Sequence, residues 1–430
     1  MDSEPPLVVV TGVGALTPLG ADAPSMWRAL LAGTSGIRAL SEPWAQELPV
    51  RIAAPVAAEP VAAPGERGFA RLDRSAQLAM VAAREAWADA GLGGGGDRAG
   101  CPMRPEDVAV VVGTGHGPQD TILSTYERLK SHGAELVSAY AMPMYLVNTA
   151  AAQVGIAVGA RAGVHTVSSA CASGAEAVAF GLDLIRTGRA RVVVAGGTDA
   201  TVTPLTIAAF CAMRALSRHS GDPAAASRPF DRARDGFVVG EGAGMVVLED
   251  ASLARSRGAK AYCEVAGGGV TSDGHHIAQP FADGRGLAAA MGLALRQAGE
   301  PVERVGLVNA HATSTPMGDA AEARALHTVL GERLPEVPVC APKSGMGHLQ
   351  GAAGAVETVI TAQSLCHRTV PPTLNSYDTD EHMGLELVRD KPRPLPDGPV
   401  VALNNSLGFG GHNVAVVLRT LPSSAPGRPA

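Results

Sequence analysis

The chain has 430 residues, of which 46% are hydrophobic and 18% are charged, and its formal net charge is −6. This balance is typical of a globular protein, and nothing in the sequence resembles the clustered basic residues of a nucleic-acid-binding protein. No apolar run is long and unbroken enough to span a membrane, and the acidic opening MDSEPPLVVVTG lacks the regions of a signal peptide. We therefore expect a cytoplasmic protein of two domains, without a nucleic-acid or membrane partner.

Short β-branched runs alternate with Ala- and Leu-rich stretches, a pattern that indicates an α/β fold. The predicted strands are 7–12, 108–115, 190–197, 244–250, 305–311, 337–342, 399–405 and 414–418. Pro and Gly recur in the predicted loops 55–66 and 92–106. The patterns GVGALTPLG and GTGHG follow strands without completing GxGxxG, so we interpret them as tight turns rather than nucleotide-binding loops.

A cysteine with small neighbours, in HTVSSACASGAEA, lies where a predicted strand (164–167) meets a predicted helix (172–187). The first turn of a helix has free N–H groups and the positive end of the helix dipole, and both favour an anion. A cysteine placed there loses its proton more easily, and the thiolate is the nucleophilic form. Cys171 is therefore a candidate nucleophile, and the alternative is a buried structural cysteine.

The six cysteines are scattered along the chain and include no CxxC pair. In a reducing compartment this pattern predicts free thiols, and it does not predict a zinc site. The cysteines are Cys101, Cys171, Cys211, Cys263, Cys340 and Cys366.

Three motifs recur in the same order in the two parts of the chain. VAVVVGTGHG is echoed by VGLVNAHATS, and the Cys171 turn is echoed by VCAPKSGMGHLQGAAGAVE. GFVVGEGAGMVVLE is echoed by SLGFGGHNVAVVL. The repeat predicts two similar α/β halves, 1–258 and 259–430, whose equivalent strand ends surround one shared site.

Three further segments occupy turns after predicted strands, where α/β proteins place ligands. NAHATSTPMGD carries His311, APKSGMGHLQGAAG carries Lys343 and His348, and NNSLGFGGHN is a glycine-rich turn before the last strand. A single histidine is more often an ordinary residue, but the repeat relates these turns to the Cys171 turn and makes both histidines candidates. No function is assigned to His116, His219 and His382.

Together with SACASG and PFDRARDGFVVGEGAG, these segments resemble the β-ketoacyl-[acyl-carrier-protein] synthase family, from about residue 7 to residue 420. Their order and spacing are far more specific than any one motif. The resemblance is to the elongating condensing enzymes of type II fatty acid synthesis and the ketosynthases of polyketide synthesis. It implies the thiolase fold, with two similar halves in αβαβα layers, as a homodimer or a heterodimer with a chain-length-factor-like homologue.

The resemblance implies that Cys171 takes an acyl group from an acyl carrier protein. His311 and His348 would donate hydrogen bonds to the oxygen that becomes negative when a malonyl group decarboxylates, and Lys343 would organise the site electrostatically. The backbone N–H groups of Cys171 and Phe409 would form the oxyanion hole. The further residues implied are Phe409 as a gate with its flanking Gly408 and Gly410, and Glu322 and Asp319 as buried supports.

The chain departs from the family pattern at several positions. Ala312 stands where the family usually has Gly, and if this position has a positive φ the Ala strains the backbone by roughly 1 kcal/mol. Val164 replaces a usual Pro, Leu407 a usual aromatic residue and His412 a usual Thr. Leu407 and His412 are expected near the pocket entrance, where they bear on the acyl-chain preference rather than on the chemistry.

The implied reaction is the decarboxylative condensation of the Cys171-bound acyl group with malonyl-[acyl-carrier-protein], giving a 3-ketoacyl chain that is two carbons longer. No cofactor is expected beyond the phosphopantetheine of the carrier. The alternatives are a non-elongating acyltransferase on the same fold, a ketosynthase subunit that works only with a chain-length-factor partner, and a non-catalytic partner. The intact set of catalytic-type residues argues against the last alternative.

Acyl carrier proteins are acidic, so the resemblance also implies a local basic docking surface despite the negative net charge. The alternative for each basic residue is an ordinary solvated surface charge. Arg214 best matches the arginine near the pocket mouth of relatives. The candidates are Arg71, Arg74, Arg128, Lys130 and Arg214.

Overall fold

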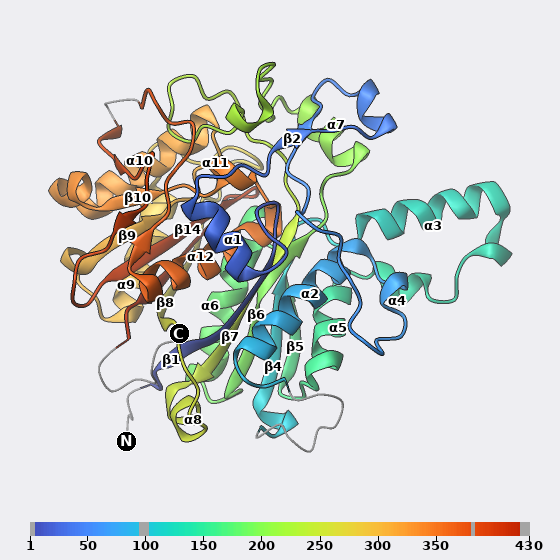
Figure 1. Ribbon diagram of the computed structural model, residues 1–430, viewed down its shortest axis with the longest axis horizontal. Helices are drawn as coiled ribbons and strands as arrows, with labels where there is room; N and C mark the ends of the chain where they lie inside the picture. The colour runs from blue at the N-terminus through green and yellow to red at the C-terminus, as the bar shows by residue number, and fades with distance from the viewer. Residues whose placement is uncertain (1–4, 94–102, 380–382, 422–430) are drawn as a thin grey trace.

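One mixed sheet of eleven strands organises the described part of the computed structural model, residues 5–93, 103–379 and 383–421 (Figure 1). Its first five strands in spatial order are β5 (Gly163–Val167), β4 (Val108–Gly113), β6 (Val192–Asp199), β7 (Gly242–Asp250) and β1 (Val8–Leu16). The other set, read inward from its outer edge, is β12 (Glu386–Leu387), β10 (Pro338–Cys340), β9 (Val305–Asn309), β14 (Val401–Gly408), β15 (His412–Arg419) and β8 (Cys263–Ser272).

Leaving β12 aside, the two sets have the same topology, because each is ordered third, second, fourth, fifth, first along the sequence. They meet where β1 and β8 pair antiparallel through Val9–Glu264 and Val10–Cys263. The predicted boundary at residue 258 falls between α8 (Ala251–Ser256) and β8. The division into two domains at that residue stays a prediction.

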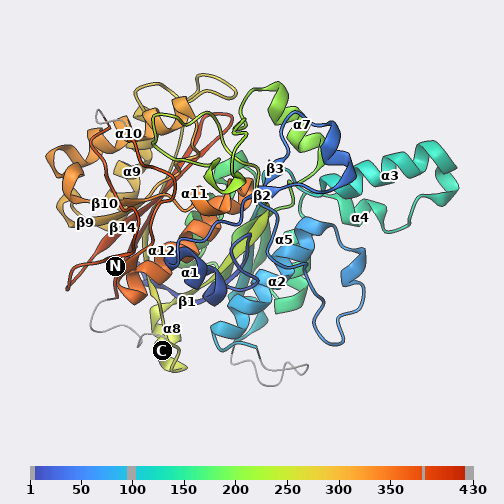
Figure 2. The same cartoon turned by 45° about the horizontal axis from the view of Figure 1, so that its top comes forward.

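Helices form a buried layer between the two sets of strands and cover the outer faces (Figures 1 and 2). The central pair is α6 (Ser173–Arg186) and α12 (Ala353–His367), which contact each other and strands of both sets. Outside lie α2 (Arg74–Asp89) and α5 (Thr149–Val158) on one set, and α9 (Arg285–Ala298) and α10 (Pro316–Leu330) on the other. This arrangement is the αβαβα layering that was predicted.

Small residues let the central helices pack closely. A Cβ atom on Gly174 of α6 would lie 2.8 Å from the carbonyl oxygen of Gly351 and from the nitrogen of Ala355. The close packing brings the turns before α6 and α12 side by side, and these turns carry the candidate residues.

Shorter elements complete the fold. The helix α3 (Gln119–His132), with α4 (Ala141–Tyr145), projects from the body as an arm in both views (Figures 1 and 2). Near the site lie α7 (Pro204–Ala212) and α11 (Lys343–Met346), and α1 (Ala23–Leu31) follows β1. The remaining two-residue strands are β2 (Arg38–Ala39), β3 (Ile52–Ala53), β11 (Thr369–Val370) and β13 (Arg393–Pro394).

Every predicted strand is present, with ends that differ by a few residues, but β8 was not predicted. Its sequence CEVAGGGVTS holds consecutive glycines, which weaken the apolar pattern of a strand. The glycines allow close packing of α9, because a Cβ atom on Gly267 or Gly269 would lie 2.2 Å or 2.0 Å from a carbonyl oxygen of α9. Close helix packing, rather than strand propensity, therefore explains this segment.

No helix among the described residues is long and apolar enough to cross a membrane. Within the same ranges, no group of three or more His, Cys, Asp or Glu side chains is arranged to hold a metal ion. Cys101 and His382 lie outside the described residues. The thiols of Cys171, Cys211, Cys263 and Cys340 are free.

Candidate active site

Cys171 lies in a single 3₁₀ turn, Ala170–Ala172, between the end of β5 and the start of α6. The strand-to-helix junction was predicted, although the α-helix begins at Ser173 rather than at residue 172. The side chain is buried, and its thiol donates a hydrogen bond to Oε1 of Gln350 over 3.3 Å. Gln350 lies in the equivalent turn before α12 and has a positive φ of 51°. The thiol is thus held between the two pseudo-equivalent turns.

The expectation of an acidic thiol at this helix N-terminus is wrong for the resting protein. Burial raises the pKa of Cys171 to about 12, and the charge of Asp199 adds to this effect. Lys343 and the N–H groups of Phe409 and Cys171 act in the opposite direction. The sequence showed a turn that favours the thiolate. It did not show the loss of solvent around the sulfur, which is the larger influence on the pKa.

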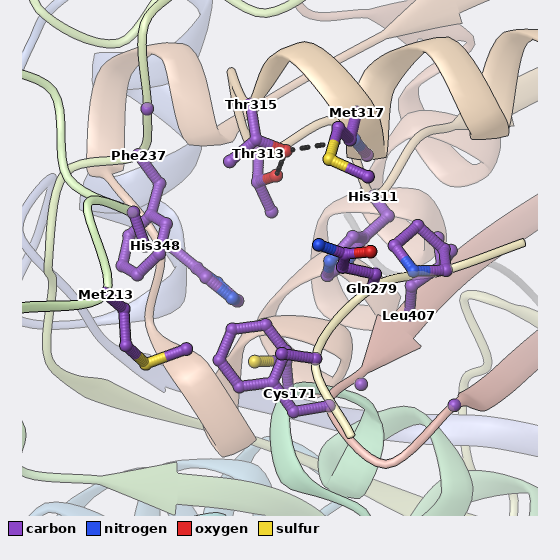
Figure 3. Close-up of a pocket in the computed structure, with 18 of the residues that line it drawn as sticks. Cys171, Met213, Phe237, Gln279, His311, Thr313, Thr315, Met317, His348 and Leu407 are labelled. Atoms are coloured by element: carbon purple, nitrogen blue, oxygen red, sulfur yellow. Dashed lines mark hydrogen bonds between the residues drawn. The ribbon is translucent and has the colours of Figure 1, made fainter. Parts of the chain in front are cut away.

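His311 follows β9, and His348 follows α11, so the two histidines come from different turns of the second half. Their ring centroids are 5.4 Å apart and the ring planes stand at 88°. Both side chains point into the space in front of Cys171 (Figure 3). Burial, followed by the charge of Lys343, lowers the pKa of each imidazole well below its usual value. At neutral pH each ring is therefore uncharged and has one N–H to donate.

Lys343 is buried beside the histidines, with 1% of its surface exposed. Its Nζ forms an ion pair with the carboxylate of Glu357 and lies 3.5 Å from Nδ1 of His311. Since an ammonium group only donates, Nδ1 of His311 accepts and the ring proton is on Nε2. Glu357 was not predicted, although it lies on α12 at the end of the quoted motif. Burial raises its pKa to about 7, and Lys343 opposes this rise.

Glu322 and Asp319 are buried carboxyl groups of α10 that bind backbone N–H groups. Glu322 accepts from the N–H groups of His311 and Ala312 at 2.8 Å and 2.7 Å. Asp319 accepts from the N–H of Phe230 at 2.8 Å and from that of Ser314 at 3.1 Å. Glu322 thus holds the turn that carries His311. Ala312 has a φ of 34°, the positive value for which a glycine was expected.

The turn between β14 and β15 packs against the cysteine turn. A Cβ atom on Gly408 would lie 2.2 Å from the carbonyl oxygen of Ser169, so only glycine allows this approach. The approach brings the N–H of Phe409 to the Cys171 sulfur. The ring of Phe409 lies 6.4 Å from that of Phe210. The N–H of Gly410, which has a φ of 90°, donates to the carbonyl of Ile277 over 2.7 Å.

A cavity of about 500 Å³ has Cys171, His311 and His348 in its wall. Most of the labelled side chains around it are apolar or hydroxylated (Figure 3). Leu407 and His412 also line the cavity, in agreement with their expected position. The further lining residues labelled in Figure 3 are Met213, Phe237, Gln279, Thr313, Thr315 and Met317.

The proposed docking residues come from different elements of the fold. Arg214 is exposed and lines the cavity. Arg128 and Lys130 lie on α3, in the projecting arm (Figure 2). Arg74 forms ion pairs with Glu59 and with the buried Glu241 at 2.6 Å and 2.7 Å, so its charge is already compensated within the chain. The docking function of these residues stays a prediction. For Arg74, the two ion pairs argue against a role in carrier docking.

His116 received no function from the sequence, but the structure places it near the nucleophile. Its Nδ1 lies 3.5 Å from the fully buried carboxylate of Asp199. Asp199 in turn accepts from the N–H of Gly351, next to Gln350, over 2.7 Å. The only sequence signal was the equivalence of the turns that carry His116 and His311.

Comparison with known proteins agrees with this geometry. Residues 6–254 match the N-terminal domain of beta-ketoacyl synthases, and residues 262–377 match their C-terminal domain. The 3-oxoacyl-[acyl-carrier-protein] synthase 2 of Mycobacterium tuberculosis (strain ATCC 25618 / H37Rv) is 39% identical over 96% of both chains.

Two solved structures are also similar over their full length. A type II polyketide ketosynthase, solved with its acyl-carrier protein and a bound hexaketide, has a TM-score of 0.88 and 28% identity over 97% of this chain and 100% of its own. The ishigamide ketosynthase/chain length factor has a TM-score of 0.85 and 30% identity over 97% of this chain and 100% of its own. The protein is therefore a member of the beta-ketoacyl synthase family.

Proposed function

We propose that the protein is a β-ketoacyl-[acyl-carrier-protein] synthase that condenses an acyl group on Cys171 with malonyl-[acyl-carrier-protein]. Membership of the family and the similarity to 3-oxoacyl-[acyl-carrier-protein] synthases support this activity. The observation that carries it is the convergence of Cys171 and the uncharged rings of His311 and His348 on one cavity. A nucleophile alone would serve acyl transfer, whereas two imidazole donors can in addition stabilise the enolate oxygen that forms on decarboxylation.

In the first half-reaction, the Cys171 sulfur attacks the carbonyl carbon of the acyl thioester on the carrier. A new C–S bond forms, the bond to the pantetheine sulfur breaks, and the thiol proton leaves with that sulfur. The N–H groups of Cys171 and Phe409 donate to the carbonyl oxygen while it is negative. Their direction toward the Cys171 sulfur supports this assignment.

In the second half-reaction, the carboxylate of the malonyl group leaves as carbon dioxide and its electron pair forms an enolate. His311 and His348 donate hydrogen bonds to the enolate oxygen, and the contact with Lys343 supports a proton on Nε2 of His311. The enolate carbon attacks the acyl carbonyl on Cys171, and the sulfur leaves as a thiolate that takes a proton from water to restore the thiol. The product is a 3-ketoacyl chain on the carrier, two carbons longer than the acyl group.

Carbon dioxide release from malonyl-[acyl-carrier-protein] tests this proposal. The wild-type protein should release carbon dioxide, and the release should require both histidines. Acylation of Cys171 without carbon dioxide release would instead indicate a non-elongating acyltransferase. No observation in the structure favours that second activity.

The partners that we propose are an acyl carrier protein and a second ketosynthase-fold chain, either identical or homologous. The matched type II ketosynthase is itself bound to an acyl-carrier protein. For the second chain, β5 is the edge strand of the sheet, and both the arm and α5, which contacts β5, expose apolar side chains. Tyr126 on α3 is 57% exposed and Ile156 on α5 is 70% exposed. Light scattering coupled to gel filtration should give a mass of two chains, alone or with the homologue.

The remaining expectations belong to the same proposal. The acyl group arrives on the phosphopantetheine of the carrier, so the residues of the site are expected to act without a cofactor. The protein is expected to work in the cytoplasm. The halves 1–258 and 259–430 are expected to correspond to the two thiolase-like units, and the repeated strand order supports this division.

A further inference from the structure

A buried carboxylate lies beside the nucleophile and is held by four hydrogen bonds. Asp199 accepts from Oγ1 of Thr114 at 2.7 Å, and from the N–H groups of Gly115, His116 and Gly351 at 3.0 Å, 3.1 Å and 2.7 Å. It is 0% exposed. Although burial favours the neutral acid, His116 and Thr114 lower its pKa, so the group is ionised.

Two of the residues that donate to this carboxylate, Gly115 and Gly351, also lie next to the nucleophile or its partner. Gly115 approaches the residue before Cys171, because a Cβ atom on it would lie 3.2 Å from the carbonyl oxygen of Ala170. Gly351 follows Gln350, which accepts the hydrogen bond of the Cys171 thiol. The negative charge of Asp199 therefore opposes the formation of a thiolate at Cys171, an effect second only to burial.

Among the described residues, His116 is the only cationic side chain in an ion pair with Asp199. Its ring also packs edge-on against Phe210, with 6.1 Å between centroids. Burial opposes protonation, but the Asp199 carboxylate, 3.5 Å from Nδ1, raises the pKa of His116 above its usual value. The nearby Lys343 forms its ion pair with Glu357.

We propose that His116 is a positioning residue for the nucleophile, whose imidazolium offsets the Asp199 carboxylate and so keeps Cys171 able to ionise. This inference rests on the proposed function, because it concerns Cys171 as the acyl acceptor. The proposal gives the site a third functional histidine. His116 acts as a cation, whereas His311 and His348 act uncharged. Loss of the His116 proton should make Cys171 less reactive.

The test is the rate of Cys171 alkylation by iodoacetamide between pH 5.5 and 9.5, measured on the Cys171 peptide by mass spectrometry. In the wild-type protein the logarithm of the rate should rise with pH, flatten where His116 loses its proton, and rise again. His116→Asn should react about tenfold more slowly below that step, the effect of one pKa unit, and match the wild type above it. His116→Lys keeps a positive charge at every pH of the range. The logarithm of its alkylation rate should therefore continue the wild-type rise seen below the step, without flattening.

Several groups near His116 could titrate in the same range, and the variants separate them. Glu357 has a pKa raised to about 7 by burial, whereas His311 and His348 have pKa values lowered well below the usual value and stay neutral. A step caused by Glu357 would persist in both His116 variants. His219→Asn, which removes a histidine in contact with Arg228 instead, is the matched control and should keep the wild-type profile.

The proposal would be overturned by a step that persists in His116→Lys, or by a profile of His116→Asn that coincides with the wild type at every pH. A uniform decrease at all pH values would indicate a structural effect only and would also overturn it. If His116→Asn does not fold, the presence or absence of the step in His116→Lys decides. Alkylation needs no carrier protein, so a failure of the condensation activity would be seen separately.

Discussion

The substitution Gly408→Ala should selectively impair acylation of Cys171. The added Cβ would lie 2.2 Å from the carbonyl oxygen of Ser169, whereas real contacts of this kind essentially never fall under 3.0 Å. The end of β14 must therefore move by about 1 Å, and the N–H of Phe409 moves with it. Loss of one oxyanion-hole donor lowers a rate by about 100- to 1,000-fold, or about 3 to 4 kcal/mol of activation free energy.

The assay is single-turnover acylation of Cys171 by an acyl carrier protein, followed by intact-protein mass spectrometry. Carbon dioxide release from malonyl-[acyl-carrier-protein] should change less than about fivefold, because the donors for that step are His311 and His348. Gly292→Ala, on α9, is the control for an added methyl group and should acylate normally. Acylation of a folded Gly408→Ala protein at the wild-type rate would refute the placement of the oxyanion hole.

Three further predictions follow from the site and its surroundings. His311→Ala and His348→Ala should each lower carbon dioxide release at least about 100-fold while Cys171 is still acylated, as measured with a radiolabelled malonyl carrier; release at the wild-type rate would exclude the paired donors. Glu357→Gln leaves the buried Lys343 without its counter-ion and should lower the free energy of unfolding by about 3 kcal/mol in urea, whereas a change below about 1 kcal/mol would mean that the ion pair is not formed. Burial raises the pKa of Glu85 to about 7, so its contribution to stability is present near pH 4 and is lost as the pH rises to about 7. Urea unfolding of Glu85→Gln should show a smaller decline over that range than the wild type, and an equal decline would contradict the raised pKa.

The parts of the fold that depend on local pattern could be predicted from the sequence. β-branched runs marked the strands, and the small residues around Cys171 marked a strand-to-helix turn, which the structure contains. β8 escaped prediction because its glycines are explained by the approach of α9, a contact between segments that the sequence pattern does not reveal. Local periodicity thus predicts helices and strands well. It fails where contacts between distant segments determine which residue type a position holds.

The same distinction between local pattern and packing applies to the residues of the candidate site. The repeat and the resemblance brought together Cys171, His311 and His348, and the structure places all three around one cavity. Gln350 was missed because its contact with Cys171 arises only when the turn before α12 packs beside the turn before α6. Glu357 was missed because its ion pair with Lys343 depends on how α11 lies against α12. The direction of the Cys171 pKa was also missed, because it depends on how much solvent the fold removes from the sulfur.

The most direct test of the central claim is intact-protein mass spectrometry of the protein with a panel of acyl carrier proteins and then with malonyl-[acyl-carrier-protein]. We predict a mass increase equal to the acyl group on the wild type and none on Cys171→Ala. Addition of the malonyl carrier should remove the acyl group and yield a carrier-bound 3-ketoacyl chain that is two carbons longer. An equal mass increase on Cys171→Ala, or discharge of the acyl group without elongation, would contradict the account.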